Sequence, residues 1–240
     1  MKDKITIAID AMGGENSPKK IIDGIVHFSK NKNNIFYKIF GKKELIDKII
    51  KKRIAENNYE IINTEEFVKD EDSALSGAKN KNTSMWLAVE SVKKKESDII
   101  ISAGNTGALL VVSKLNLKMI ENIDKPALSG LWPSRKGMSV VLDLGANIEC
   151  SDKNLSDFSI MGASLFKALF PTENPKVALL NIGSEAEKGN EILKNTYQKL
   201  IKSKNSNFEF KGFVEGNELM NGDVNVIVSD GFTGNVALKT

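Results

Sequence analysis

Short apolar runs alternate with helix-period runs along most of the chain. Nine of the short runs are rich in Ile, Val, Leu or Phe and are bounded by polar residues, a pattern that predicts β-strands. They span residues 5–10, 35–40, 59–63, 98–102, 126–131, 139–144, 176–182, 208–213 and 224–229. Several are apolar on both faces, as strands of a parallel sheet are when helices cover both sides.

The segments between these runs carry apolar residues at helical spacing. The first predicted helix begins at "SPKKIIDGIVHF", with Ser17 as its N-cap and Pro18 in its first position. Further helices are predicted near residues 42–53, 84–96, 106–120, 155–169 and 187–203. Alternating strands and helices predict an α/β protein with a mostly parallel sheet.

No Pro-, Gly- or Ser-rich linker divides the sequence. The simplest prediction is one continuous α/β core over residues 1–240, and two lobes without a marked boundary are the alternative. The final segment "GFTGNVALKT" has the character of an opening helical turn, and it reaches Thr240 without a closing signal. We therefore expect a fragment that lacks a C-terminal portion.

Composition and charge set the class of protein. Hydrophobic residues make up 41% of the chain and charged residues 27%, and Cys150 is the single cysteine. The sequence has no apolar stretch of about 20 residues and no signal peptide, so it predicts a soluble, cytoplasmic protein. The formal net charge of +3 is spread along the chain and argues against nucleic acid as a partner. Lysine-rich runs at 51–53 and 93–95 fit solvated helix ends, and docking of an acidic partner is the alternative.

Polar, glycine-bearing segments follow five of the predicted strands. They read "DAMGGENSP", "SAGNTG", "DLGAN", "NIGSEAEKGNE" and "SDGFTGN", and the second and fifth share the spacing S-x-G-x-T-G. In parallel sheets, the carboxyl ends of strands and the helix N-termini after them line the ligand crevice. One such loop can be merely a turn with a helix cap. Five together predict a shared ligand site.

Missing motifs narrow the chemistry. The sequence contains neither a Walker A loop nor a G-x-G-x-x-G fingerprint, which disfavours an ATPase or a Rossmann dehydrogenase. His27, the only histidine, falls in the first predicted helix, where we expect a packing or surface role. Cys150 has no histidine partner in sequence, so a covalent thiol role is disfavoured. No zinc-type spacing occurs, although scattered aspartates could hold magnesium.

A site rich in Gly, Asn, Thr and Ser with one well-placed Lys suits an anionic substrate whose reaction needs charge stabilisation more than proton transfer. Inorganic phosphate already carries nucleophilic oxygens at neutral pH. The protein would have to hold it, orient the electrophile and stabilise an oxyanion.

Six segments together resemble a known family. "IAIDAMGGENSP", "SAGNTGAL", "DKPAL", "LDLGAN", "LLNIGSEAEKGNE" and "DGFTGNVALK" follow the order and spacing of bacterial phosphate acyltransferase, from Ile7 to Lys239. The resemblance implies that inorganic phosphate attacks the thioester of a long-chain acyl carrier protein, giving acyl phosphate for phospholipid synthesis. It also implies a three-layer α/β/α fold like that of isocitrate and isopropylmalate dehydrogenases, with no nicotinamide cofactor. Glu15 departs from the family, which usually has Asp there.

The resemblance carries site residues over to this sequence. It implies that Lys188 binds phosphate or the developing oxyanion and that Asn235 donates its side-chain N–H to the thioester carbonyl oxygen. Supporting positions that shape the crevice are Asp10, Gly13, Gly14, Asn105, Thr106, Asn147, Glu185, Asp230 and Thr233. No metal ligand is implied.

Partners also follow from the resemblance. It implies a homodimer that works at the inner surface of the membrane and passes acyl phosphate to a glycerol-3-phosphate acyltransferase. Two other functions remain open at this point. One is a phosphate acetyl- or butyryltransferase that uses coenzyme A, and the other is an inert regulator that binds acyl carrier protein or a phospholipid precursor.

Overall fold

The chain folds into two compact units, each built around its own β-sheet. The computed structural model describes residues 4–30, 34–171, 173–203 and 207–240. Unit 1 is Met1–Lys118 and unit 2 is Met119–Thr240. The prediction of one continuous core is therefore replaced by the two-lobe alternative. The boundary left no mark in the sequence because the connecting residues 118–128 form neither helix nor strand yet are not rich in Gly, Pro or Ser.

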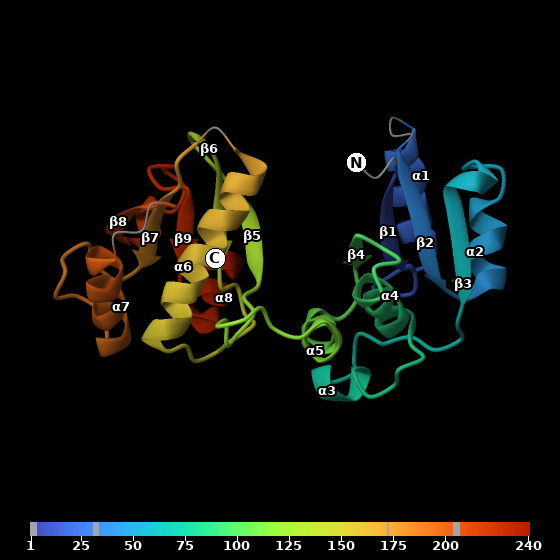
Figure 1. Ribbon diagram of the computed structural model, residues 1–240, viewed down its shortest axis with the longest axis horizontal. Coiled ribbons are helices and arrows are strands. Elements are labelled where there is room, and N and C mark those ends of the chain that lie inside the picture. Colours follow the sequence, from blue (N-terminus) through green and yellow to red (C-terminus); the bar gives the residue numbers. More distant parts are fainter. Residues whose placement is uncertain (1–3, 31–33, 172, 204–206) are drawn as a thin grey trace. The chain divides into compact units, whose positions relative to one another are not determined.

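Unit 1 holds a four-stranded sheet in the order β3-β2-β1-β4, with all neighbours parallel. Its elements are β1 (Ile5–Asp10), α1 (Lys19–Ser29), β2 (Ile35–Gly41), α2 (Lys43–Ile50), η1 (Glu56–Asn58), β3 (Tyr59–Asn63), α3 (Ala74–Gly77), α4 (Ser84–Lys93), β4 (Ile99–Ser102) and α5 (Thr106–Leu117) (Figure 1). Alternate residues of β1 face opposite layers. Ile7 and Ile9 pack in one core with α1 and α2, whereas Ala8 packs with Ala88 of α4.

Unit 2 holds a five-stranded sheet in the order β5-β6-β9-β7-β8. Its elements are β5 (Ser129–Ser134), β6 (Gly137–Leu142), α6 (Asp152–Leu169), β7 (Lys176–Leu180), α7 (Glu191–Lys202), β8 (Glu209–Val214), η2 (Gly216–Glu218), β9 (Val226–Val228) and α8 (Gly231–Lys239) (Figure 1). One core joins the sheet to α6 and α7 through Phe158 and Leu200, and another joins its opposite face to α8 through Ala237. The unit therefore has three layers.

All nine predicted strands are present, and the predicted mostly parallel α/β/α class is confirmed. β5 is the exception in direction, because it pairs with β6 in antiparallel register. Three helix starts were wrong. α6 begins at Asp152 rather than near residue 155, because the Ser151 side chain caps it there. Ser17 does not cap α1, since its hydroxyl donates to the Gly13 carbonyl at 2.6 Å and Pro18 occupies the N-cap position. α7 begins at Glu191 rather than near residue 187, because the Asn190 side chain caps it there.

Candidate functional site

Three strands of unit 2 end side by side at one edge of the sheet. Leu142 of β6 is the register partner of Val228 of β9, which in turn pairs with Leu179 of β7. After these strands the chain enters the loops 143–151, 229–230 and 181–190. The helix after β9 covers the opposite face of the sheet from the helices after β6 and β7. Such a change of side between neighbouring strands is where open α/β sheets bind ligands.

Asp143 organises the first of these loops from within. Its side chain is fully buried, and its two carboxylate oxygens accept five N–H bonds. The donors are the backbone amides of Leu128, Gly145, Ala146 and Asn147 and the Asn147 side chain, at 2.8 to 3.1 Å. A buried carboxylate needs this number of donors to offset its lost hydration. Asp143 therefore fixes the backbone of the loop rather than facing a ligand.

Asn147 belongs to the same internal network. Its side-chain nitrogen donates to the Pro126 carbonyl at 2.7 Å and to Asp143 at 2.8 Å, which uses both of its N–H groups. Its own carbonyl accepts from the Gly231 amide at 2.8 Å and thereby joins the loop to the start of α8. Asn147 therefore ties the loop after β6 to Pro126 and to the start of α8.

The N-termini of α6, α7 and α8 all begin beside this edge. Ser151, Asn190 and Asp230 cap the three helices through their side chains, and Ser151 forms a reciprocal capping box with Asn154. Asp230 accepts from the backbone amide of Thr233 at 2.8 Å and from its hydroxyl at 2.9 Å. The first turn of a helix presents unpaired N–H groups and partial positive charge. The three helix starts therefore supply N–H donors at this edge, beside the carboxylates of Asp152, Glu191 and Asp230.

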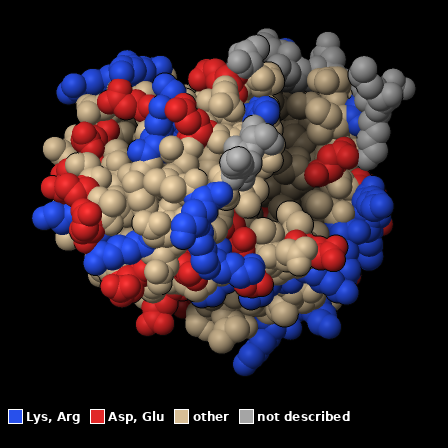
Figure 2. All heavy atoms as spheres, turned by 60° about the vertical axis from the view of Figure 1, so that its left-hand side comes forward, with Lys and Arg blue, Asp and Glu red and all other residues tan. Residues whose placement is uncertain are grey.

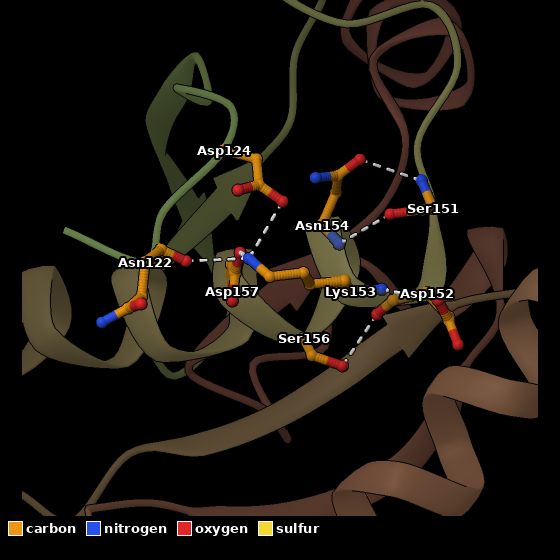
Figure 3. A network of polar contacts seen from close by, with 8 residues as sticks. All are labelled: Asn122, Asp124, Ser151, Asp152, Lys153, Asn154, Ser156 and Asp157. Carbon is orange, nitrogen blue, oxygen red and sulfur yellow. Dashed lines mark hydrogen bonds and ion pairs between the residues drawn. The ribbon is translucent and has the colours of Figure 1, made fainter. Parts of the chain in front are cut away.

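A cluster of charged side chains holds the first turn of α6 in place. Figure 3 shows the Lys153 ammonium pointing at the Asn122 carbonyl and at the carboxylates of Asp124 and Asp157, at 2.8, 3.0 and 2.8 Å. Asp152 pairs with Lys199 of α7 at 2.6 Å. Together these contacts tie the start of α6 to the segment before β5 and to α7.

Two adjoining cavities open at this edge. The larger, of about 880 Å³, is lined by residues from the first turns of α6, α7 and α8, and also by Lys125, Ile148, Glu149 and Cys150. The second, of about 560 Å³, is lined mainly by apolar side chains of β7, α7 and α8. Both have Asn190, Leu193, Asp230, Phe232 and Thr233 in their walls. The two cavities therefore adjoin, and we call the pair the groove, with the larger cavity as its polar end and the smaller as its apolar end.

Lys188 lies on the loop between β7 and α7. Its side chain is exposed, and within the described residues it makes no ion pair. An added Cβ on Gly183 would lie 2.9 Å from Glu185 Oε2 and 3.0 Å from Lys188 Cγ, so both side chains pass over that glycine. The buried Asn181 side chain shapes the loop by donating to the Lys188 carbonyl at 3.1 Å and accepting from the Ile182 amide at 2.9 Å.

Asn235 lies in the second turn of α8 and faces the loop after β6. Its side-chain nitrogen donates to the Leu144 carbonyl at 3.0 Å. The amide has a second N–H, which no described residue accepts. Lys188 and Asn235 are thus on neighbouring loops and helices at the same edge of unit 2, but neither is among the residues that line the two cavities.

The remaining predicted residues lie in unit 1, at the carboxyl ends of β1 and β4. Asp10 is buried and accepts bonds from the hydroxyls of Ser84 and Ser102 at 2.6 and 2.8 Å. Burial raises the pKa of its carboxyl above the ordinary value of 3.8, against the lowering effect of these bonds. Asp10 therefore joins two strand ends and α4.

The loops after β1 and β4 touch through their glycines. A Cβ on Gly13 would lie 2.8 Å from the Gly104 amide nitrogen, and one on Gly14, whose φ is +82°, would lie 2.3 Å from the Ala103 carbonyl oxygen. Asn105 caps α5 through Ala108 and also donates to the Asp72 carbonyl at 2.8 Å. Thr106, the first residue of α5, is exposed. These positions form a second polar strand edge, within unit 1.

Sequence reasoning did not single out Asp143 or Asn181 as site residues. Each is the polar residue that directly follows the last buried positions of a strand, which is the signal that could have identified them. Both satisfy backbone groups of the loops in which the predicted residues lie. They act as positioning residues.

Charges outside the cavities are mixed. Figure 2 shows Lys and Arg side chains interspersed with Asp and Glu over the face that it presents. In the two lysine-rich runs, Arg53 pairs with Asp23 at 2.8 Å and Lys94 pairs with Glu90 at 3.0 Å.

His27 is exposed in the last turn of α1, at the end of the helix away from the strand carboxyl ends. Burial raises the pKa of the Cys150 thiol above its ordinary value of 9.0, which makes it a poor nucleophile at neutral pH.

Comparison with known proteins places the chain in a family. A family model described as "Fatty acid synthesis protein" matches residues 5–240. The phosphate acyltransferase of Pelagibacter ubique is 69% identical over 241 residues, which cover 100% of this chain and 72% of that protein. The chain belongs to the phosphate acyltransferase family. It is therefore an acyltransferase of fatty acid and phospholipid synthesis.

A more distant member agrees with this assignment, and solved structures share the fold. The phosphate acyltransferase of Neorickettsia sennetsu is 40% identical and is covered over 70% of its length. A phosphotransacetylase from Streptococcus pyogenes superposes with a TM-score of 0.72 at 15% identity, over 98% of this chain and 80% of that one. EutD phosphotransacetylase from Staphylococcus aureus gives a TM-score of 0.70 at 15% identity, over 99% and 81% of the two chains. At this identity the structures show that the fold is shared.

Among residues 4–30, 34–171, 173–203 and 207–240, no three His, Cys, Asp or Glu side chains lie close enough together to hold a metal ion. Within the same residues, no helix combines the length and the apolar character that crossing a bilayer would require.

Proposed function

We propose that this acyltransferase moves a fatty acyl group from acyl carrier protein to inorganic phosphate and forms acyl phosphate. The observation that carries the proposal is the groove of unit 2. Its polar end is bordered by three capped helix N-termini, and its apolar end extends along α8. An anion and an alkyl chain are the two chemical parts that a phosphate acyltransferase must hold together.

In the proposed reaction a phosphate oxygen attacks the thioester carbonyl carbon. A carbon–oxygen bond forms, the carbonyl oxygen becomes an oxyanion, and the carbon–sulfur bond then breaks with its electron pair leaving on the carrier-protein sulfur. Phosphate needs no general base, because its oxygens are already nucleophilic. The main tasks of the protein are orientation and charge stabilisation.

We assign the cationic role to Lys188. Its ammonium makes no ion pair within the described residues, and it extends from a loop whose backbone is held by Asn181. An unpaired, exposed ammonium beside helix N-termini can bind phosphate or the oxyanion as a charge-assisted donor. Side-chain motion of a long lysine would carry it to the groove.

Asn235 receives the role of oxyanion donor in this proposal. One N–H of its amide is held by the Leu144 carbonyl, which orients the side chain, and the second N–H is the one available for the thioester carbonyl. An amide that is fixed by one bond before substrate arrives loses less freedom on binding. Asp230, Thr233, Asn147 and Glu185 shape the surrounding loops, as do Asp10, Gly13, Gly14, Asn105 and Thr106 at the edge of unit 1.

The experiment that tests the function offers the chain inorganic phosphate with palmitoyl-loaded acyl carrier protein and, separately, palmitoyl coenzyme A. Acyl phosphate is trapped with hydroxylamine and quantified. We expect product from the carrier-protein thioester at the higher kcat/KM. A higher kcat/KM with palmitoyl coenzyme A would mean that the donor is a coenzyme A thioester and not acyl carrier protein. Binding of acyl carrier protein without any product would favour a regulator.

Partners beyond the donor are part of the same proposal. Acyl carrier protein is acidic, so complementary charge on this chain would speed encounter, and added salt should slow transfer. Transfer rates that do not change with salt would contradict this docking mode. A homodimer, a glycerol-3-phosphate acyltransferase as the recipient of acyl phosphate, and contact with the membrane surface complete the proposed setting.

A further inference from the structure

The apolar end of the groove has no role in holding phosphate. It is a cavity of about 560 Å³ whose walls include Leu180, Ile182, Leu193, Leu219, Phe232 and Val236. Three of these are widely exposed, with 83% of Ile182, 64% of Phe232 and 53% of Val236 accessible. Side chains of this kind gathered around one hollow indicate a ligand-binding surface.

The cavity contains little that would oppose an apolar ligand. Asp230 is the one charged residue among its described lining residues, and its carboxylate is already bonded by the amide and hydroxyl of Thr233. The other polar lining groups are directed into the loop. Asn181 is bonded to the Lys188 carbonyl and the Ile182 amide, and Asn190 caps α7.

The cavity also adjoins the polar end. Asn190, Leu193, Asp230, Phe232 and Thr233 line both hollows, so the two lie side by side along these residues. A ligand with a polar head and an apolar tail would place the head at the helix N-termini and the tail beyond Phe232. An acyl thioester has this polarity.

We propose that the cavity beside α8 binds the alkyl chain of the acyl donor and thereby sets chain-length preference. This inference rests on the proposed function, because it assigns a subsite for the substrate of that reaction. A volume of about 560 Å³ is within the range of ligand pockets and leaves room for a long chain. Each methylene that is buried there should raise kcat/KM by up to about fourfold.

The test compares two substitutions on the same helix. Val236→Trp places a large ring in the wall of the cavity, whereas Leu238→Trp adds the same ring two residues away, at a position that is 49% exposed and lines neither cavity. Each variant and the wild type receive acyl carrier protein loaded with butyryl, octanoyl or palmitoyl groups. The readout is the ratio of kcat/KM for palmitoyl to that for butyryl. Because the carrier protein is the same in every assay, an effect on docking cancels in this ratio.

We expect the ratio to fall about tenfold or more in Val236→Trp, because several methylenes lose their contacts, and to stay at the wild-type value in Leu238→Trp. If Val236→Trp has a lowered melting temperature, Ile182→Trp serves as a second test, because Ile182 lines the same cavity from the loop after β7. It should lower the palmitoyl-to-butyryl ratio in the same way. A palmitoyl-to-butyryl ratio that is unchanged in both Val236→Trp and Ile182→Trp would overturn the alkyl-chain subsite and would leave the proposed function standing. Failure of every donor to give acyl phosphate, even with wild-type protein, would overturn the proposed function and this subsite with it.

Discussion

Two buried aspartates, Asp10 and Asp143, hold the loops that follow β1 and β6. Both carboxylates are directed inward and accept bonds from backbone amides or hydroxyls. Lys188, to which the proposed function assigns phosphate, is exposed on the loop after β7. At the residue scale, the inward-facing aspartates therefore fix loop backbones and are distinct from this exposed lysine.

Asp10 gives the chain a pH-dependent stability. Burial raises the pKa of its carboxyl above 3.8 in the folded protein, so the protonated form is favoured by folding. The stability that it contributes is fully present below pH 3.8 and is lost as pH rises through the raised pKa. Asp10→Asn does not titrate, so the variant does not lose stability in this way as pH rises. The free energy of unfolding in urea, taken as variant minus wild type, should therefore rise with pH from 3.8 to the raised pKa of Asp10.

The same comparison has a clear opposite outcome. A difference between Asp10→Asn and wild type that stays constant from acidic to neutral pH would mean that the pKa of Asp10 is not shifted by folding.

At the scale of elements, α8 depends on one close approach. Gly234 packs so tightly on the loop after β6 that an added Cβ would lie 1.9 Å from the Asp143 carbonyl oxygen. Backbone atoms cannot move aside at that distance without shifting the helix. The glycine therefore places α8, with Asn235 and the wall of the groove, against the Asp143 loop.

Two glycine substitutions test this packing. Gly234→Ala should destabilise the protein by about 1–3 kcal/mol, the usual cost of overpacking a core. Gly24→Ala, in the middle of α1, has no neighbour within 4 Å of the added Cβ and should stabilise by about 0.5–1 kcal/mol. Thermal and urea unfolding of the two variants measure both effects. Equal stability of the two variants would contradict the proposed placement of α8.

Much of the element order could be predicted from the sequence, because buried strands are short apolar runs and their ends are marked by polar residues. The direction of β5 could not, since it depends on which strand becomes its neighbour. The start of α7 was missed because Asn190, its cap, follows a loop of similar polar residues. For the site, the sequence located the loops at strand ends. It could not tell that Asn147 and Asp10 turn inward, because their partners, the Pro126 carbonyl and the hydroxyls of Ser84 and Ser102, come from distant segments.

At the scale of the whole molecule, the two units have separate cores and each contains one tryptophan. Trp86 lies in the core of unit 1 and Trp132 in that of unit 2, and both are 8% exposed. Fluorescence of a variant with one tryptophan therefore reports the unfolding of one unit. Trp132→Phe leaves the reporter of unit 1, and Trp86→Phe leaves that of unit 2.

Gly234→Ala is then added to each of the two single-tryptophan variants, and the two unfolding midpoints should move apart. The substitution lies in unit 2, so the urea midpoint that Trp132 reports should fall more than the midpoint that Trp86 reports. Equal shifts of the two midpoints would show that the units unfold as one cooperative block.

Lys188 is the cation that we propose at the edge of unit 2, and the proposed chemistry depends on it. The most direct measurement is the rate of acyl phosphate formation from palmitoyl-loaded acyl carrier protein and phosphate by Lys188→Ala, with Lys202→Ala, an exposed lysine at the end of α7, as the matched control. We predict that Lys188→Ala loses about 10²-fold in kcat/KM and that Lys202→Ala retains the wild-type value. A Lys188→Ala enzyme as active as the control would contradict the central claim.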